Sequence, residues 1–168
     1  MRFVKIMSLC LIFGIFSPVA QAAGAYFGVK GGFFEVENSN YDKAVNGGII
    51  VGAHFIASSV HTVSLEGELT TTVLPGDITG GNEWEIDTFG LFGAFRAGSG
   101  VYFKGKMGYI DRSISYKFGG VSDRNSLAYG IGFGIRRGTE RRIEVEYTII
   151  DDDNTFTDIK FLSIGLIF

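Results

Sequence analysis

The chain has 168 residues, 15 lysines and arginines against 18 acidic residues, and a single cysteine. This length suits one domain, one cysteine excludes a disulfide framework, and the negative balance argues against a nucleic-acid partner. Glycine is abundant (25 residues) and 14% of the residues are aromatic, without a collagen-like or low-complexity period.

The first 22 residues have the pattern of a secretory signal peptide. Arg2 and Lys5 precede an apolar run over residues 6–16, and Ala20-Gln21-Ala22 is a small-x-small cleavage site. The run is too short for a membrane-spanning helix, which needs about 20 residues. We expect cleavage after Ala22, which leaves a domain of residues 23–168 with no cysteine and with 13 bases against 18 acids, a net charge of −5.

Apolar side chains recur with period two along the rest of the chain, which is the pattern of β-strands with two different faces. Helical periodicity is not found. Eight strands are predicted in chain order, over residues 25–34, 47–56, 62–73, 84–96, 101–115, 127–136, 142–150 and 156–168. An even count suits a single-chain antiparallel barrel, and the longer connections after most odd strands indicate its outer side.

The fourth predicted strand has an ambiguous face. Glu85 and Asp87 share their parity with Phe89 and Leu91, so unbroken alternation would mix charged and apolar residues on one side. A β-bulge near Thr88 is therefore expected, because a bulge shifts the phase by one residue.

The two faces indicate which side of the barrel meets lipid. One face is rich in Gly, Ser, Thr and charged residues, and the other is large, aromatic and β-branched. Eight strands leave an interior only just wide enough for side chains, so the small and charged face fits inside and the apolar face suits acyl chains. A soluble barrel with the opposite polarity is the alternative. In lipid the last strand must pair with the first, because no water satisfies an open edge.

Aromatic residues are expected to form girdles at both rims of the barrel. The outer set is Phe33, Phe34, Trp84, Tyr116, Phe118 and Phe156, and the inner set is Tyr26, Phe27, Phe55, Phe95, Phe103 and Phe168. The chain ends on a strand in which Ile164, Leu166 and Phe168 share one face. A terminal aromatic residue on a closing strand is typical of a bacterial outer-membrane barrel.

The chain resembles the OmpA/OmpX-like porin-family group, small eight-stranded outer-membrane β-barrel proteins of Gram-negative bacteria. The resemblance is carried by segments 26–30, 101–109, 129–134, 144–147 and 164–168. It implies an all-β, eight-stranded antiparallel up-and-down transmembrane β-barrel in the cell outer membrane. It also implies that the barrel-assembly machinery recognises Ile164, Leu166 and Phe168, although Leu166 stands where an aromatic residue is usual.

A network of charged side chains is predicted inside the barrel. Its expected members are Lys30, Glu66, Glu68, Lys104, Lys106, Arg112, Arg136, Glu144 and Glu146. Most fall at similar heights on the inward faces of odd strands, and buried charges are tolerable only when they are paired. We expect a structural network that blocks the lumen, with an ion pathway or paired-carboxylate catalysis as the alternatives.

Other candidate chemistry is sparse. His54 is expected to face inward and His61 to lie in a turn beside Ser58, without the Ser/His/acid set of a lipid A-modifying enzyme. The acidic segment 151–154 is expected to be a solvated turn, with calcium binding as the alternative. No catalytic residue, metal or cofactor is predicted.

The expected function is a structural or adhesin-like role at the cell surface, with a narrow porin-like channel and a lipid A-modifying enzyme as alternatives. The four predicted outer loops hold nine acids and three bases. Such a rim should repel anionic polymers and hold divalent cations shared with lipopolysaccharide. The expected partners are outer-membrane lipids and lipopolysaccharide, the barrel-assembly machinery and an extracellular ligand of the loops.

Overall fold

The computed structural model describes residues 24–37, 40–137, 141–151 and 158–168. These residues form nine strands: β1 (Ala25–Val36), β2 (Ala44–Ala57), β3 (His61–Leu74), β4 (Gly76–Ile78), β5 (Asn82–Gly98), β6 (Val101–Tyr116), β7 (Val121–Arg137), β8 (Arg141–Ile150) and β9 (Ile159–Ile167). Among them, no helix has the length and apolar character needed to cross a membrane. The predicted signal peptide, residues 1–22, lies outside the described residues.

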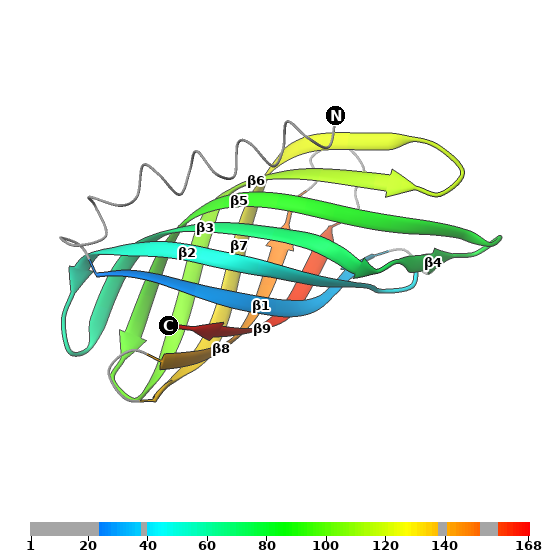
Figure 1. The fold of residues 1–168 in the computed structure, drawn as a ribbon. Coiled ribbons are helices and arrows are strands. Elements are labelled where there is room, and N and C mark those ends of the chain that lie inside the picture. Colours follow the sequence, from blue (N-terminus) through cyan, green and yellow to red (C-terminus); the bar gives the residue numbers. More distant parts are fainter. Residues whose placement is uncertain (1–23, 38–39, 138–140, 152–157) are drawn as a thin grey trace.

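The eight long strands close into an antiparallel barrel (Figure 1). Strands adjacent in sequence pair in order, β3 pairs with β5, and β1 pairs with β9 to close the wall. At this seam the Phe168 N–H donates to the Phe27 carbonyl at 2.7 Å, and the Phe27 N–H donates to the Phe168 carbonyl at 3.1 Å. The predicted eight-stranded up-and-down barrel, with its first and last strands paired, is confirmed.

Several strands extend further toward the outer end than the sequence indicated. β7 begins at Val121, six residues before the predicted start at residue 127. The short strand β4 pairs with the start of β5 at the rim. Polar residues were interpreted as loops, but they continue the strands above the apolar part of the wall. The first three outer connections are accordingly shorter than predicted, whereas β9 begins at Ile159, later than the expected residue 156.

The expected bulge near Thr88 is wrong. The pairing of β5 with β6 is continuous from Trp84 opposite Tyr116 to Gly98 opposite Tyr102, with Thr88 opposite Arg112. Register shifts occur instead between β2 and β3, near residues 45–46 and 54–56. Because β5 alternates without interruption, Glu85 and Asp87 face outward, on the same side as Phe89 and Leu91.

The alternation along β7 shows the two faces of the wall. The outward residues are Leu127, Tyr129, Ile131, Phe133 and Ile135, and they alternate with the inward Ala128, Gly130, Gly132 and Gly134. At Gly134 a Cβ atom would overlap the ring of Tyr102, so any side chain there would have to displace this ring. The outward run covers about 20 Å of height at ~3.3 Å per residue and a tilt of about 40°, comparable with the apolar band of an outer-membrane barrel.

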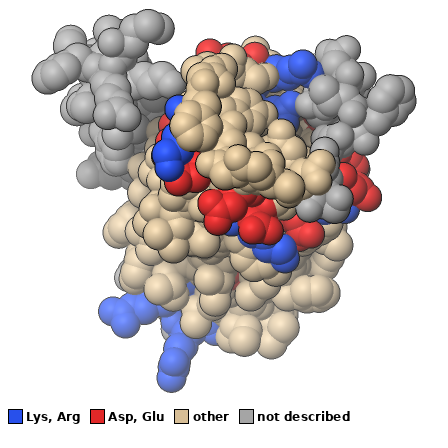
Figure 2. All heavy atoms as spheres, turned by 90° about the vertical axis from the view of Figure 1, so that its right-hand side faces the viewer, with Lys and Arg blue, Asp and Glu red and all other residues tan. Residues whose placement is uncertain are grey.

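Toward the outer end the polarity of the two faces is reversed. Asp87, Asp111 and Asp123 are exposed on the outside of β5, β6 and β7. The interior at this end is an apolar cluster of Phe34, Ala44, Trp84, Ile86, Phe92, Ile110, Ala128, Ile150, Ile159 and Phe161. Figure 2, which looks onto the end that carries β4, shows charged side chains around it. This part of the wall has the polarity of a soluble barrel and is built to stand in water.

This reversal corrects the predicted aromatic girdles. Phe34 and Trp84 were assigned to the outer girdle but lie inside the barrel, 1% and 0% exposed. Tyr26, assigned to the inner girdle, is also buried in the interior. Of these three, only Tyr26 was placed on the inward face by its alternation with Phe27. Aromatic residue type alone was a poor guide to lipid contact.

Candidate functional site: a charge belt in the lumen

Eight charged side chains meet inside the barrel, and together they are called the charge belt. They come from β1, β3, β5, β6 and β8, and all are buried: Lys30, Glu66, Glu68, Arg96, Lys104, Lys106, Glu144 and Glu146. Each lies at an inward position of its strand, so all eight side chains point into the barrel interior. Glycines such as Gly130 and Gly132 leave the room that these long side chains occupy.

Arg96 organises the part of the belt nearest the periplasmic end. Its guanidinium pairs with Glu66 and, through Nε at 2.7 Å, with Glu144. Two tyrosine hydroxyls donate to the same carboxylates: Tyr26 to Glu66 at 2.5 Å and Tyr102 to Glu144 at 2.6 Å. Both glutamates are thus held by an arginine and a phenol at once.

Lys104 connects this group to the rest of the belt. Its Nζ atom lies 2.8 Å from Glu66, 2.9 Å from Glu144 and 2.5 Å from Glu146. One ammonium group with three donors therefore serves three carboxylates.

Lys30 and Lys106 complete the belt by sharing Glu68 and Glu146. Lys106 Nζ lies 2.6 Å from Glu68 and 2.7 Å from Glu146. Lys30 Nζ lies 2.8 Å from Glu68 and 3.7 Å from Glu146. All seven of the lysines and glutamates that the sequence assigned to the odd strands are therefore brought together.

Arg96 is the belt residue that the sequence analysis missed. With it, the belt holds four cations and four carboxylates and has no net charge. The signal was present, because Arg96 has the opposite parity to the outward Phe89, Leu91 and Phe95. Because a bulge near Thr88 was assumed, this alternation was not used to assign Arg96 to the interior.

Two other predicted members lie apart from the belt. Arg112 is buried inside the barrel at the level of Thr88, and Arg136 is half-buried near the periplasmic end, 5.8 Å from the ring of Tyr102. Among the ion pairs of the described residues, neither arginine is joined to a belt glutamate. Within the described part of the chain, the observed network thus contains Arg96 and does not contain the predicted Arg112 and Arg136.

A second inward arginine that the prediction omitted, Arg142, lies near the periplasmic end. Its guanidinium stands 4.5 Å from the ring centre of Tyr26, and one of its nitrogens is 3.5 Å from His54 Nε2. His54 also stacks on Tyr26, with ring centres 4.6 Å apart. His54 therefore faces inward as expected and packs with cationic and aromatic groups.

The C-terminal residues Ile164, Leu166 and Phe168 lie on the outer face, as their shared parity predicted. Phe168 stacks on Phe27 of β1 with ring centres 5.4 Å apart. Their recognition by assembly machinery stays a prediction.

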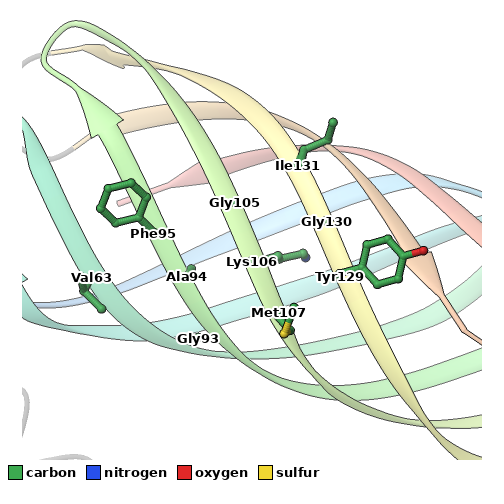
Figure 3. A pocket seen from close by; sticks show the side chains of 10 residues that line it. All are labelled: Val63, Gly93, Ala94, Phe95, Gly105, Lys106, Met107, Tyr129, Gly130 and Ile131. Atoms are coloured by element: carbon green, nitrogen blue, oxygen red, sulfur yellow. The ribbon is translucent and has the colours of Figure 1, made fainter.

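A shallow groove lies on the outer wall across β5, β6 and β7. Outward-facing Gly93 and Gly105 leave its floor without side chains, and Phe95, Met107 and Tyr129 stand around it (Figure 3). Lys106 also borders the groove, but its ammonium group is held by Glu68 and Glu146 in the lumen. The groove surface is apolar.

Elsewhere the described residues offer little for catalysis or metal binding. His61 was expected in a turn but is the first residue of β3. Its backbone N–H donates to the Ser58 hydroxyl at 2.9 Å, and its ring stacks against Phe95. Within the described segments, no group of three or more His, Cys, Asp or Glu side chains is arranged to hold a metal ion. The acidic segment 152–154 lies outside the described residues.

Comparisons with known proteins agree with this architecture. A family model described as "Outer membrane protein beta-barrel domain" matches residues 7–168. No curated protein matches the chain. Among solved structures, Ail, the attachment invasion locus protein of Yersinia pestis, is 14% identical, with a TM-score of 0.62 over 86% of this chain and 97% of that one.

Two further structures share the fold. Neisserial surface protein A is 14% identical, with a TM-score of 0.58 over 86% of this chain and 96% of that chain. The outer membrane enzyme PagL is 11% identical, with a TM-score of 0.51 over 83% of this chain and 97% of that chain. One fold thus carries surface proteins and an enzyme, so function has to be argued from residues.

Proposed function

Because this chain belongs to the family of outer membrane protein beta-barrel domains, we propose that it is a closed outer-membrane barrel that acts through its extracellular rim. The protein resides in the outer membrane of a Gram-negative bacterium. The observation that carries the proposal is the neutral charge belt, in which all four glutamates are ion-paired.

The belt supports a closed lumen for two reasons. First, Lys104 and Arg96 reach carboxylates on different strands, so their side chains cross the interior. Second, the apolar cluster around Trp84 and Phe92 lies in the lumen on the outer side of the belt, together with the buried Arg112. An ion would have to separate buried pairs and then pass closely packed apolar side chains, and both steps are unfavourable.

The rim supplies the surface that remains for interaction. β5, β6 and β7 carry acidic side chains on the outside of their outer ends, at Glu85, Asp87, Asp111 and Asp123. The exposed Lys43 pairs with a different rim acid, Glu35. We propose that the rim binds a cationic or neutral partner in an adhesin-like role, and that its acids share divalent cations with lipopolysaccharide.

Ail has also been solved in complex with the heparin analogue sucrose octasulfate. For this chain the acidic rim points to weak binding of such polyanions, because like charges repel. Binding of vesicle-reconstituted protein to immobilised heparin and to immobilised polylysine tests this. We expect retention on polylysine only, reduced when Glu85, Asp87 and Asp111 are changed to amides; strong retention on heparin would contradict the proposal.

Two experiments separate this proposal from a channel and from an enzyme. In planar bilayers we expect no discrete openings, and steady unitary currents would support a pore instead. Incubation with lipid A followed by mass analysis should return unchanged lipid, because a Ser/His/acid set is not found among the described residues. Any deacylated or otherwise modified product would overturn the non-enzymatic assignment.

We propose in addition that Ile164, Leu166 and Phe168 are read by the barrel-assembly machinery. The three side chains lie on the outer face of β9, where the alternation is unbroken. This face is accessible before β9 pairs with β1.

A further inference from the structure

Four arginines crowd the hairpin between β7 and β8 at the periplasmic end of the barrel. The register sets Arg136 opposite Arg142 and Arg137 opposite Arg141. Like charges directly opposite each other destabilise an antiparallel pair. Residues 136–142 contain four arginines and one acid, Glu140, and so carry a net charge of +3.

The two arginine pairs face different surroundings. Arg136 and Arg142 face inward and lie against the rings of Tyr102 and Tyr26. Arg137 and Arg141 are exposed on the outer face. Among the described residues, no carboxylate forms an ion pair with this outer pair and no aromatic ring stacks on it. An anion bound from outside the chain would relieve the repulsion between these two arginines.

The outer pair lies where lipid headgroups begin. The next outward residues on the same strands are Ile135 and Ile143, which belong to the apolar band and are 57% and 39% exposed. Two residues along a strand cover about 6.6 Å, which places the guanidinium groups just beyond the acyl chains of the periplasmic leaflet. The other two turns at this end, residues 57–61 and 98–101, contain no Lys, Arg, Asp or Glu. The positive charge is thus confined to one hairpin.

The chemistry of the pair matches a phosphodiester. A guanidinium binds phosphate oxygens through two parallel N–H donors. Opposed residues on antiparallel strands have Cβ atoms about 5 Å apart, so both forks can reach one phosphate. A zwitterionic headgroup would bring its own ammonium group toward two cations, whereas an anionic headgroup would not.

We propose that Arg137 and Arg141 form a binding site for an anionic phospholipid of the periplasmic leaflet, of which phosphatidylglycerol is the representative. The site lies at the opposite end of the barrel from the rim. It is therefore independent of the extracellular binding proposed above, and either proposal can fail alone.

The test uses the full barrel reconstituted in phosphatidylethanolamine vesicles with a minor fraction of phosphatidylglycerol. The protein is extracted in mild detergent, and the lipids that remain bound are quantified by mass spectrometry. Two arginines near an anionic surface should enrich phosphatidylglycerol roughly tenfold or more over its share of the vesicle, and 0.5 M NaCl should reduce this enrichment. Absence of enrichment in the unmodified protein would overturn the proposal without any variant.

Matched variants locate the site. R137Q/R141Q should lose the enrichment, whereas K43Q/K117Q, which removes the same charge at the extracellular end, should keep it. The heat-dependent gel shift of a folded barrel verifies that both variants fold. Enrichment that persists in R137Q/R141Q would refute the site, as would displacement of the lipid by inorganic phosphate at an ionic strength where NaCl does not displace it, because the site would then bind free anions.

Discussion

Arg96 offers the sharpest test of the charge belt, because one guanidinium group holds two glutamates. It pairs with Glu66 and Glu144 and also donates to the Ser64 hydroxyl at 2.8 Å. The substitution Arg96→Met keeps a long side chain but leaves three cations against four carboxylates. Glu66 and Glu144 would then still share Lys104 as a partner but would lose the guanidinium group of Arg96.

The expected loss of stability follows from the burial of the pair. Removing one partner of a buried ion pair costs about 3–5 kcal/mol, since the other charge is left uncompensated. The double variant R96M/E66Q restores neutrality, with three cations and three carboxylates. We therefore expect it to be less destabilised than the sum of the two single variants, by roughly 1–3 kcal/mol.

The assay is equilibrium urea unfolding of the barrel in lipid vesicles. Trp84 is the only tryptophan and is fully buried, so its emission reports loss of the barrel interior. The reasoning is refuted if Arg96→Met lowers the unfolding free energy by less than about 1 kcal/mol, which is the range of exposed pairs. Strict additivity in the double variant would refute it as well.

Three further predictions use the same barrel. Lys104→Met should lower the free energy of unfolding in urea by about 3–5 kcal/mol. Lys117→Gln, which breaks only the exposed pair with Glu83, should change it by less than about 1 kcal/mol. Equal effects of the two substitutions would argue against a buried belt. Gly134→Ala should cost about 1–3 kcal/mol, because its methyl group meets the Tyr102 ring, whereas Gly165→Ala finds only ordinary contacts beyond 3.5 Å and should be nearly neutral. Phe168→Ala should lower the amount of barrel in outer-membrane fractions on immunoblots while the purified protein still refolds in detergent; an unchanged yield would count against a C-terminal assembly signal.

Much of the fold could be predicted from alternation alone. In a barrel wall each side chain faces either inside or outside, so the parity of Lys104 or Ile131 fixes its side. Seven of the eight belt residues followed from this rule, and Arg96 would have followed as well if β5 had been taken as unbroken. The apparent conflict at Glu85 and Asp87 arose because an outward charge was assumed to lie in lipid.

The remaining errors have one physical cause. Parity shows which face a residue occupies, but it does not show where along the strand lipid gives way to water. Trp84 and Phe34 alternate like any wall residue, yet they lie at the outer end, where the interior is apolar. Strand length above the apolar band also cannot be read from polar composition, because Asp123 and Asn125 suit an exposed strand as well as a loop.

Site-directed labelling tests the central claim most directly, namely that the wall is apolar outward within the bilayer, charged inward, and reversed in polarity at its outer end. The only cysteine, Cys10, precedes the expected cleavage site, so single cysteines can be placed at will. A fluorophore on Ile131→Cys should be quenched by lipids brominated on their acyl chains, whereas Asp87→Cys should react with a water-soluble maleimide and escape quenching. If Ile131→Cys instead reacts like Asp87→Cys and is not quenched, the apolar face does not meet lipid and the account fails.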